Sequence, residues 1–284
     1  MHAIRSILVV IQQQSSHDLA LKRARRIADA TGAHLHLLIC ADQDDHLEQL
    51  CDDLSMAGYS CSAQLSTQDD RVQAIIAAQQ SEGCGLVIKQ HLPDNPLKRA
   101  LLTPDDWKLL RYCPAPVLLV KQARNWSDGA VLAAVDIGNS DEQHHTLHGA
   151  IIDHGYQLAE LARTELHVIG AHASPLLPVA DPTFQLREVH EQRYREQCRA
   201  FQQQYEIDDR HLHIVEGPAD VSIAQVAGQL QASVTVIGSV ARTGFAGALI
   251  GNTAEVILDT LDSDMLVLKP DSVIDHLLQQ DAPH

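Results

Sequence analysis

The residues best suited to ligand chemistry lie in a glycine-rich stretch of the C-terminal half. A short β-branched run ends at Gly238, the loop after it carries Arg242, and Gly251-Asn252-Thr253 then predicts a helix start. Glycines permit close backbone approach, and amides at a helix N-terminus attract anions. The pattern predicts a phosphate-type site, with a purely structural, turn-rich connection as the alternative. The candidate residues are Gly238, Ser239, Arg242, Gly244, Gly251, Asn252 and Thr253.

A carboxylate, Asp136, follows the apolar run Leu132–Val135 and is the second candidate. At a strand end it can bind a ribose or a metal ion, but a lone carboxylate is not a catalytic pair. The sequence has neither a Gly-x-Ser-x-Gly elbow nor a Gly-Lys-Ser/Thr phosphate loop. No catalytic residue is predicted, and an enzyme is the less favoured class.

The chain has 17 histidines, and one pair, His144 and His148, is spaced by four residues in a predicted helix. Such spacing can place two imidazoles on one helix face, as a zinc site needs. With so many histidines a pair of this kind is expected by chance, so no metal ligand is predicted. Further histidines on or near strands are interpreted as packed, hydrogen-bonded side chains: His167, His172, His211 and His213.

The composition disfavours some classes of partner. The 284 residues include 37 acidic and 21 basic side chains, and the formal net charge of −16 argues against a nucleic-acid or anionic-membrane surface. Apolar runs fall short of the roughly 18 residues that a membrane span requires, and residues 7–11 are too few for a signal peptide. Six scattered cysteines indicate reduced thiols. We therefore expect a cytoplasmic protein.

Strands and helices are predicted to alternate along the chain, and the same order of elements occurs twice. This alternation predicts parallel sheets covered on both faces, with ligands at the carboxyl ends of the strands. The polar residues 122–128 predict a linker between units 1–124 and 129–284. The second unit is lengthened by residues 173–186 and by a charged helix over 187–205, which is expected to have a solvated face. The matching segments are Leu8–Ile11 with Leu132–Val135, Gly32–Ile39 with Arg163–Gly170, Leu86–Lys89 with Thr235–Gly238, and Val117–Lys121 with Met265–Lys269.

The two copies differ where a ligand would bind. Gln12 and Lys89 stand in the first copy where Asp136 and Gly238 stand in the second. The loop after Lys89 has no glycine, and its prolines remove amide donors. We therefore expect any phosphate-type ligand in the second copy only.

Taken together, these residues resemble the universal stress proteins, and the tandem plan resembles the E type of that family. The resemblance covers nearly the whole chain. It implies two tandem Rossmann-like domains of the adenine-nucleotide alpha hydrolase type, each a five-stranded parallel sheet flanked by helices. It also implies that the last strands of the two units pair across a two-fold, which gives an internal pseudo-dimer whose remaining surface can support a homodimer. The most specific segments are Gly238-x-x-Ala-Arg-Thr-Gly244, Gly251-Asn-Thr-Ala-Glu255 and Thr103–Lys121.

In ATP-binding members of that family the motif is Gly-x-x-Gly-x(9)-Gly-Ser/Thr, together with an aspartate that ends the first strand. Carried over to this sequence, the resemblance implies that Asp136 meets the adenosine and that the Ala171 backbone flanks the base. It implies further that Gly238 approaches the ribose–phosphate and that Gly251 and Asn252 hold phosphate oxygens.

Two positions depart from the motif, because Ala241 replaces the second glycine and Asn252 replaces Ser or Thr. The favoured hypothesis is a stress-response protein that binds a small molecule, ATP or another adenine nucleotide with magnesium, in its second copy and regulates a protein partner. Two alternatives stay open. One is a slow ATP hydrolase that uses the same loop, and the other is a scaffold or a binder of an apolar, lipid-like ligand.

Overall fold

A computed structural model describes residues 4–11, 18–41, 46–91, 105–139, 141–172, 184–239 and 260–280, with backbone alone at 142–144, 184–191 and 280. The elements up to the middle of the chain are β1 (Ser6–Val10), α1 (Leu19–Thr31), β2 (His34–Cys40), α2 (Leu47–Met56), β3 (Cys61–Ser66), α3 (Arg71–Ser81), β4 (Leu86–Gln90), α5 (Asp105–Tyr112), β5 (Val117–Val120) and the short helix η1 (Trp126–Asp128).

The elements that follow repeat this order as far as β9, with longer helices before and after β7. They are β6 (Val131–Val135), α6 (Glu142–Ala162), β7 (Leu166–His172), α7 (Phe184–Tyr205), η2 (Asp209–His211), β8 (Leu212–Glu216), α8 (Ala219–Gln229), β9 (Val234–Gly238), β10 (Asp264–Leu268) and α10 (Asp271–Gln280). No helix of the described part of the chain has the length and apolarity to cross a membrane.

Local sequence signals set several of these boundaries. Asp18 caps α1 by accepting a hydrogen bond from Leu21 N (2.9 Å), and Gly32 ends the helix with a φ of 69°. Asp70 caps α3 in the same way and accepts hydrogen bonds from the amides of Val72 and Gln73.

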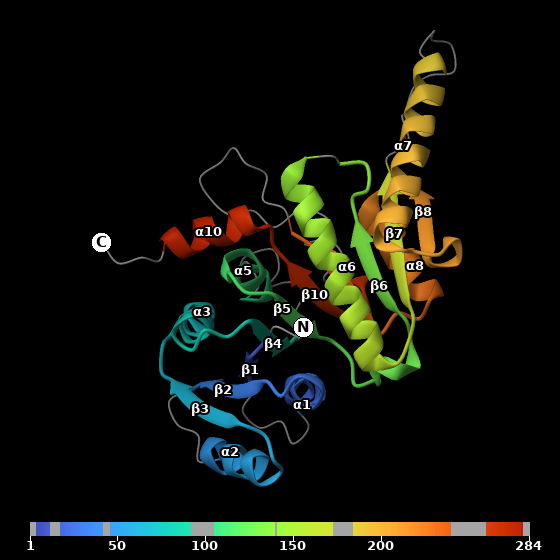
Figure 1. The fold of residues 1–284 in the computed structure, drawn as a ribbon. Helices are drawn as coiled ribbons and strands as arrows, with labels where there is room; N and C mark the ends of the chain where they lie inside the picture. Colours follow the sequence, from blue (N-terminus) through green and yellow to red (C-terminus); the bar gives the residue numbers. More distant parts are fainter. Residues whose placement is uncertain are drawn as a thin grey trace.

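The strands form one ten-stranded sheet in the order β3-β2-β1-β4-β5-β10-β9-β6-β7-β8 (Figure 1). Every neighbouring pair is parallel except β5 and β10, which run antiparallel with Leu118 opposite Leu266. The predicted class, α/β with parallel strands flanked by helices, is confirmed. The expected pairing of the two last strands is present, and it makes the two five-stranded halves one continuous sheet.

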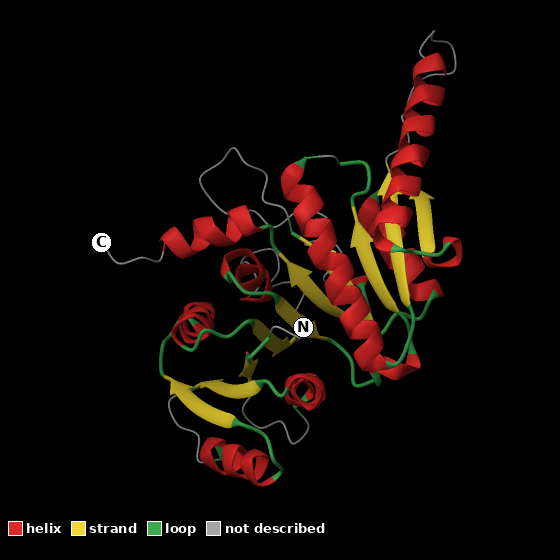
Figure 2. Ribbon diagram, viewed as in Figure 1, coloured by secondary structure: helices red, strands yellow, loops and turns green. Residues whose placement is uncertain are grey.

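Helices cover both faces of this sheet (Figure 2). Buried side chains of α1, α2, α6 and α7 belong to the apolar core on one face, and those of α3, α5 and α8 to the core on the other. The charged helix α7 has an exposed face, which includes Arg193, Glu196 and Arg199. On its other face Cys198 and Phe201 are buried and Tyr194 packs on the same core. All six cysteines carry free thiols.

A buried carboxylate, Asp264, joins the two halves at the centre of the sheet. It accepts hydrogen bonds from Arg23 Nε (2.7 Å) on α1 and from Trp126 Nε1 (2.7 Å) on η1. Its other oxygen accepts from the backbone N of Lys121 (2.9 Å), directly after β5. Arg23 lies over the Trp126 ring, 5.0 Å from its centroid, and its guanidinium also donates to the carbonyls of Gln122 and Arg124. Trp126 thus packs at the seam between the halves.

Two equivalent lysines cross the same seam. Lys121, which follows β5, donates to the carbonyl of Leu261 before β10. Lys269, which follows β10, donates to the carbonyl of Cys113 before β5 (2.6 Å). Burial lowers the pKa of Lys269 to about 8. Each half therefore satisfies a carbonyl at the start of the other half's last strand.

We predict that Asp264→Asn lowers the free energy of unfolding by about 3–5 kcal/mol, because it leaves the charge of Arg23, only 2 % exposed, without its buried partner. Urea denaturation followed by circular dichroism measures this loss. The matched control is Asp262→Asn at an exposed position two residues away, which should change stability by less than about 0.5 kcal/mol. Equal effects of the two substitutions would contradict the assignment.

Candidate functional site

The site that the sequence predicts lies where β6 and β9 end. These neighbouring strands are parallel, and the chain continues from β6 to β7 on one side while β9 lies on the other. Such a reversal of strand order is where open α/β sheets bind ligands, because the connections leave in opposite directions and open a crevice. Of the candidate residues, the structure describes Asp136, Ala171, Gly238 and Ser239 around this point. The others lie outside the described residues: Arg242, Gly244, Gly251, Asn252 and Thr253, together with Ala241.

The side chain of Asp136 is exposed at the end of β6. Its backbone carbonyl accepts a hydrogen bond from Asn139 N (3.0 Å), and Asn139 Oδ1 accepts one from Asp141 N (3.2 Å). These bonds form a tight turn between β6 and α6. The turn holds the Asp136 carboxylate at the carboxyl edge of the sheet, where a ligand can reach it.

Gly238 has a structural role that the motif alone does not reveal. A Cβ at this position would lie 2.6 Å from Leu147 Cδ2 and 3.1 Å from Ile151 Cδ1, both on α6. An alanine here would require the Leu147 side chain to move, so the glycine lets α6 pack closely against the end of β9. The next amide, Ser239 N, donates a hydrogen bond to Leu268 O (2.8 Å), so this N–H is already used in pairing with β10.

An aromatic side chain from α7 borders the same edge. A Cβ on Gly170 would lie 3.0 Å from the hydroxyl oxygen of Tyr194, and one on Gly138 would lie 3.3 Å from its ring. The Tyr194 ring also packs on that of His172, with 4.6 Å between centroids. Burial first, and then the nearby thiol of Cys198 and carboxylate of Asp136, raise the pKa of the Tyr194 phenol. Sequence reasoning missed Tyr194, because nothing in a polar helical run shows which residue faces the sheet end.

In the first half the equivalent strand end holds an ionic cluster. Lys89, at the position of Gly238, forms an ion pair with Asp106 of α5, and His91 forms a second hydrogen bond with the same carboxylate. Burial by itself would raise the pKa of Asp106. The hydrogen bond from His91 and the charge of Lys89 outweigh burial and hold that pKa below its ordinary value.

A separate cluster of imidazoles lies near the amino ends of β7 and β8. It contains His167 and His213, whose ring nitrogens are 3.0 Å apart, together with His211 and the carboxylate of Glu165. The prediction of hydrogen-bonded histidines is consistent with this arrangement, but the sequence did not show that they lie together. The helix expected to carry His144 and His148 is α6, but the His144 side chain lies outside the described residues. His148 is buried against Phe201.

Comparison with known proteins places this geometry in a family. The profile of the universal stress protein family matches residues 129–269. A crystal structure from Pseudomonas aeruginosa UCBPP-PA14, assigned to the universal stress proteins, is 57 % identical, covers 99 % of both chains and superposes with a TM-score of 0.90. The chain belongs to the universal stress protein family.

Other universal stress proteins and related structures extend the comparison. A crystal structure of a protein of unknown function from Pseudomonas aeruginosa PAO1 is 58 % identical, with a TM-score of 0.89 over 98 % of this chain and 97 % of that one. Universal stress protein E of Salmonella typhi is 35 % identical over 208 residues, 70 % of this chain. The alignment spans 64 % of that relative, somewhat less than two thirds of its length.

We predict that Asp106→Asn lowers the free energy of unfolding by about 3 kcal/mol at neutral pH, because Lys89 loses the charge that offsets its burial. Since the pKa of Asp106 is depressed in the folded protein, its stabilising contribution is present above the ordinary aspartate pKa and is lost as the pH falls through the lowered value. The difference in stability between Asp106→Asn and the unsubstituted protein should therefore disappear at acid pH. Thermal unfolding between about pH 7 and pH 3 measures it.

The exposed neighbour Asp105 provides the control for this series. Asp105→Asn should change stability by less than about 1 kcal/mol at neutral pH. A difference between Asp106→Asn and the unsubstituted protein that stays constant with pH would contradict the ionic cluster.

Proposed function

We propose that this chain is a ligand-binding universal stress protein with an adenine-nucleotide site in its second half, at the ends of β6 and β9. The observation that carries the proposal is the contrast between equivalent strand ends. In the second half an exposed carboxylate and an aromatic side chain border the crevice, whereas in the first half Lys89, His91 and Asp106 fill the corresponding place with an ion pair. The units 1–124 and 129–284 are proposed as the two domains, joined as an internal pseudo-dimer through β5 and β10.

The side chains described at these strand ends have the chemical groups that a nucleoside site needs. An exposed carboxylate such as that of Asp136 accepts hydrogen bonds from ribose hydroxyls. The rings of Tyr194 and His172 form an aromatic wall beside β7, where a planar base can pack next to Ala171. The glycine loop, known here from sequence, would supply backbone amides to phosphate oxygens, and bound magnesium would offset their charge.

The proposed role is regulatory. Nucleotide contacts with the residues after Ser239 would change the surface presented to a protein partner, in a cytoplasmic stress response. In this mechanism the residues of the chain bind and orient the nucleotide. None of them transfers a proton or cleaves a bond.

Calorimetric titration of ATP with magnesium, after removal of co-purified nucleotide, tests the site. We predict about one site per chain, with affinity reduced about 10–100-fold in Asp136→Ala because charged hydrogen bonds to the ligand are lost. Gly251→Val should abolish binding, since a β-branched side chain obstructs backbone approach. The matched control is Gln12→Ala at the equivalent position of the first half, which should bind as the unsubstituted protein does. A folded, nucleotide-free protein that binds no ATP would overturn the proposal and favour a scaffold or an apolar ligand.

A second prediction concerns the aromatic wall. Tyr194→Ala should weaken nucleotide binding about fivefold, a loss of ~1 kcal/mol for one side of a stacked base, whereas Tyr194→Phe should bind normally. Fluorescence titration with a labelled adenine nucleotide measures both variants. If the tyrosine ring instead fills the space that a base requires, Tyr194→Ala would bind more tightly, which is the opposite of the expected result.

A further inference from the structure

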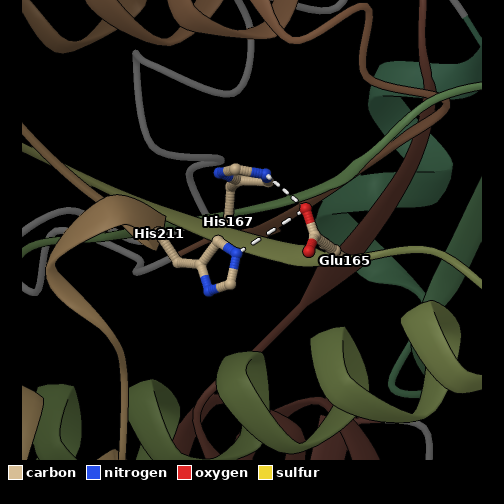
Figure 3. Close-up of side chains that lie close together, drawn as sticks. All are labelled: Glu165, His167 and His211. Carbon is tan, nitrogen blue, oxygen red and sulfur yellow. Dashed lines mark ion pairs between the residues drawn. The ribbon is translucent and has the colours of Figure 1, made fainter.

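The cluster of Glu165, His167 and His211 lies at the end of the sheet opposite to the proposed nucleotide site. Glu165 immediately precedes β7, His167 is the second residue of that strand, and His211 immediately precedes β8. Figure 3 shows the two imidazoles and the carboxylate turned toward a common point. The cluster is therefore separate from Asp136 and the glycine loop, which lie at the carboxyl ends of the strands.

The distances in this cluster are close to those of a metal site. Glu165 Oε2 lies 3.7 Å from His211 Nε2 and 4.0 Å from His167 Nε2, and one ligand atom from each residue falls within 4.8 Å of the others. In a tetrahedral zinc site with bonds of about 2.0–2.1 Å, the ligand atoms are roughly 3.4 Å apart. Small side-chain movements therefore close the site. The exposed Glu165, with 66 % of its side chain accessible, can make them at little cost.

A fourth residue, His213, sets the orientation of His167. Its Nε2 lies 3.0 Å from His167 Nδ1, so one imidazole donates and the other accepts. When Nδ1 of His167 is the donor, its Nε2 carries the lone pair and faces Glu165, which is the arrangement that a metal ligand needs. His211 packs edge-on against the His167 ring, with 4.9 Å between centroids.

The first half of the chain shows what this position looks like without such a cluster. His36 stands at the position of His167. Its nitrogens contact Ser62 Oγ at 2.7 Å and Gln64 Oε1 at 3.2 Å on the neighbouring strand, and the exposed carboxylate of Glu82 lies 3.9 Å from its Nδ1. In the second half the ring of His213 bonds His167 directly. His211 and the carboxylate of Glu165, at the position of His34, lie with His167 so that one ligand atom of each falls within 4.8 Å of the others. Imidazole and carboxylate side chains are common metal ligands. Imidazoles that face one another are seldom all protonated at once, because their positive charges repel.

The surroundings favour a cation. A cleft of about 360 Å³ adjoins His211, and the carboxylates that line it create a negative potential beside the cluster. Imidazole nitrogen ligands favour zinc and other divalent transition metals over magnesium and calcium, which prefer oxygen ligands alone. The acidic residues lining this cleft are Glu160, Glu165, Glu206 and Asp208.

We propose that Glu165, His167 and His211 bind a divalent transition metal of the zinc type, with His213 as the residue that positions His167. The metal ties the segment before β7 to the segment before β8, the strand at the edge of the sheet. Binding at this point stabilises the outer edge of the second half, because the metal binds the folded arrangement and not the unfolded chain.

Zinc titration of untagged protein, stripped of metal and in competition with a chromophoric chelator, tests the proposal. One Zn²⁺ per chain is expected, with a rise in melting temperature. His211→Gln and His167→Gln should lose this site, and His213→Gln should weaken it roughly 10–100-fold while retaining the one-to-one stoichiometry. The matched control is His36→Gln, which alters the equivalent histidine of the first half and should leave zinc binding unchanged.

Cobalt substitution identifies the ligands. A tetrahedral Co²⁺ spectrum without thiolate charge-transfer absorption is expected, since no cysteine belongs to the cluster. His211 ends the short helix η2 and is not part of a strand, so its substitution tests binding even if His167→Gln, inside β7, fails to fold. Zinc binding that is unchanged in folded His211→Gln, a thiolate spectrum, or the absence of any tight site in the unsubstituted protein would each overturn the proposal.

Discussion

The carboxylate of Asp264 is fully buried and accepts hydrogen bonds from three segments that are distant in sequence: α1, the end of β5 and η1. A buried charge is tolerated only when it is paired and fully hydrogen-bonded, so these partners must meet whenever the chain folds. The interaction fixes β10 beside β5 and thereby aligns the two five-stranded halves as one sheet. Lys121 and Lys269 reinforce the same joint by reaching across it in opposite directions.

This shared framework leaves the strand ends free to diverge. Equivalent positions carry Lys89 in one half and Gly238 in the other, and the consequences differ accordingly. Lys89 reaches Asp106 and fills its strand end with charge, whereas Gly238 lets α6 pack closely against β9 below an exposed Asp136. At the opposite end of the strands the asymmetry recurs, because His36 bonds hydroxyl and amide oxygens, with Glu82 3.9 Å away, whereas His167 bonds one imidazole and groups with a second imidazole and a carboxylate. One architecture thus presents different chemistry in its two copies.

Much of the fold follows from local signals. Apolar runs such as residues 7–11 and caps such as Asp18 act on their immediate neighbours, so the sequence predicts the strands, most helices and the doubling of the plan. The meeting of Lys89, His91 and Asp106, the approach of Tyr194 to Gly170, and the histidine cluster depend on contacts between distant segments. Spacing along the chain does not encode those contacts. The close packing at Gly238 is an example, because the motif suggests a ligand while the structure also shows Leu147 against this position.

The central claim is that nucleotide binding belongs to the second half alone, on a framework that both halves share. Hydrogen–deuterium exchange with and without saturating ATP and magnesium tests it most directly, because it reports on every segment at once. The account predicts slower exchange in the segments that follow β6 and β9, with the segments after β1 and β4 unchanged. Equal protection after β1 and β4, or protection confined to the first half, would contradict it.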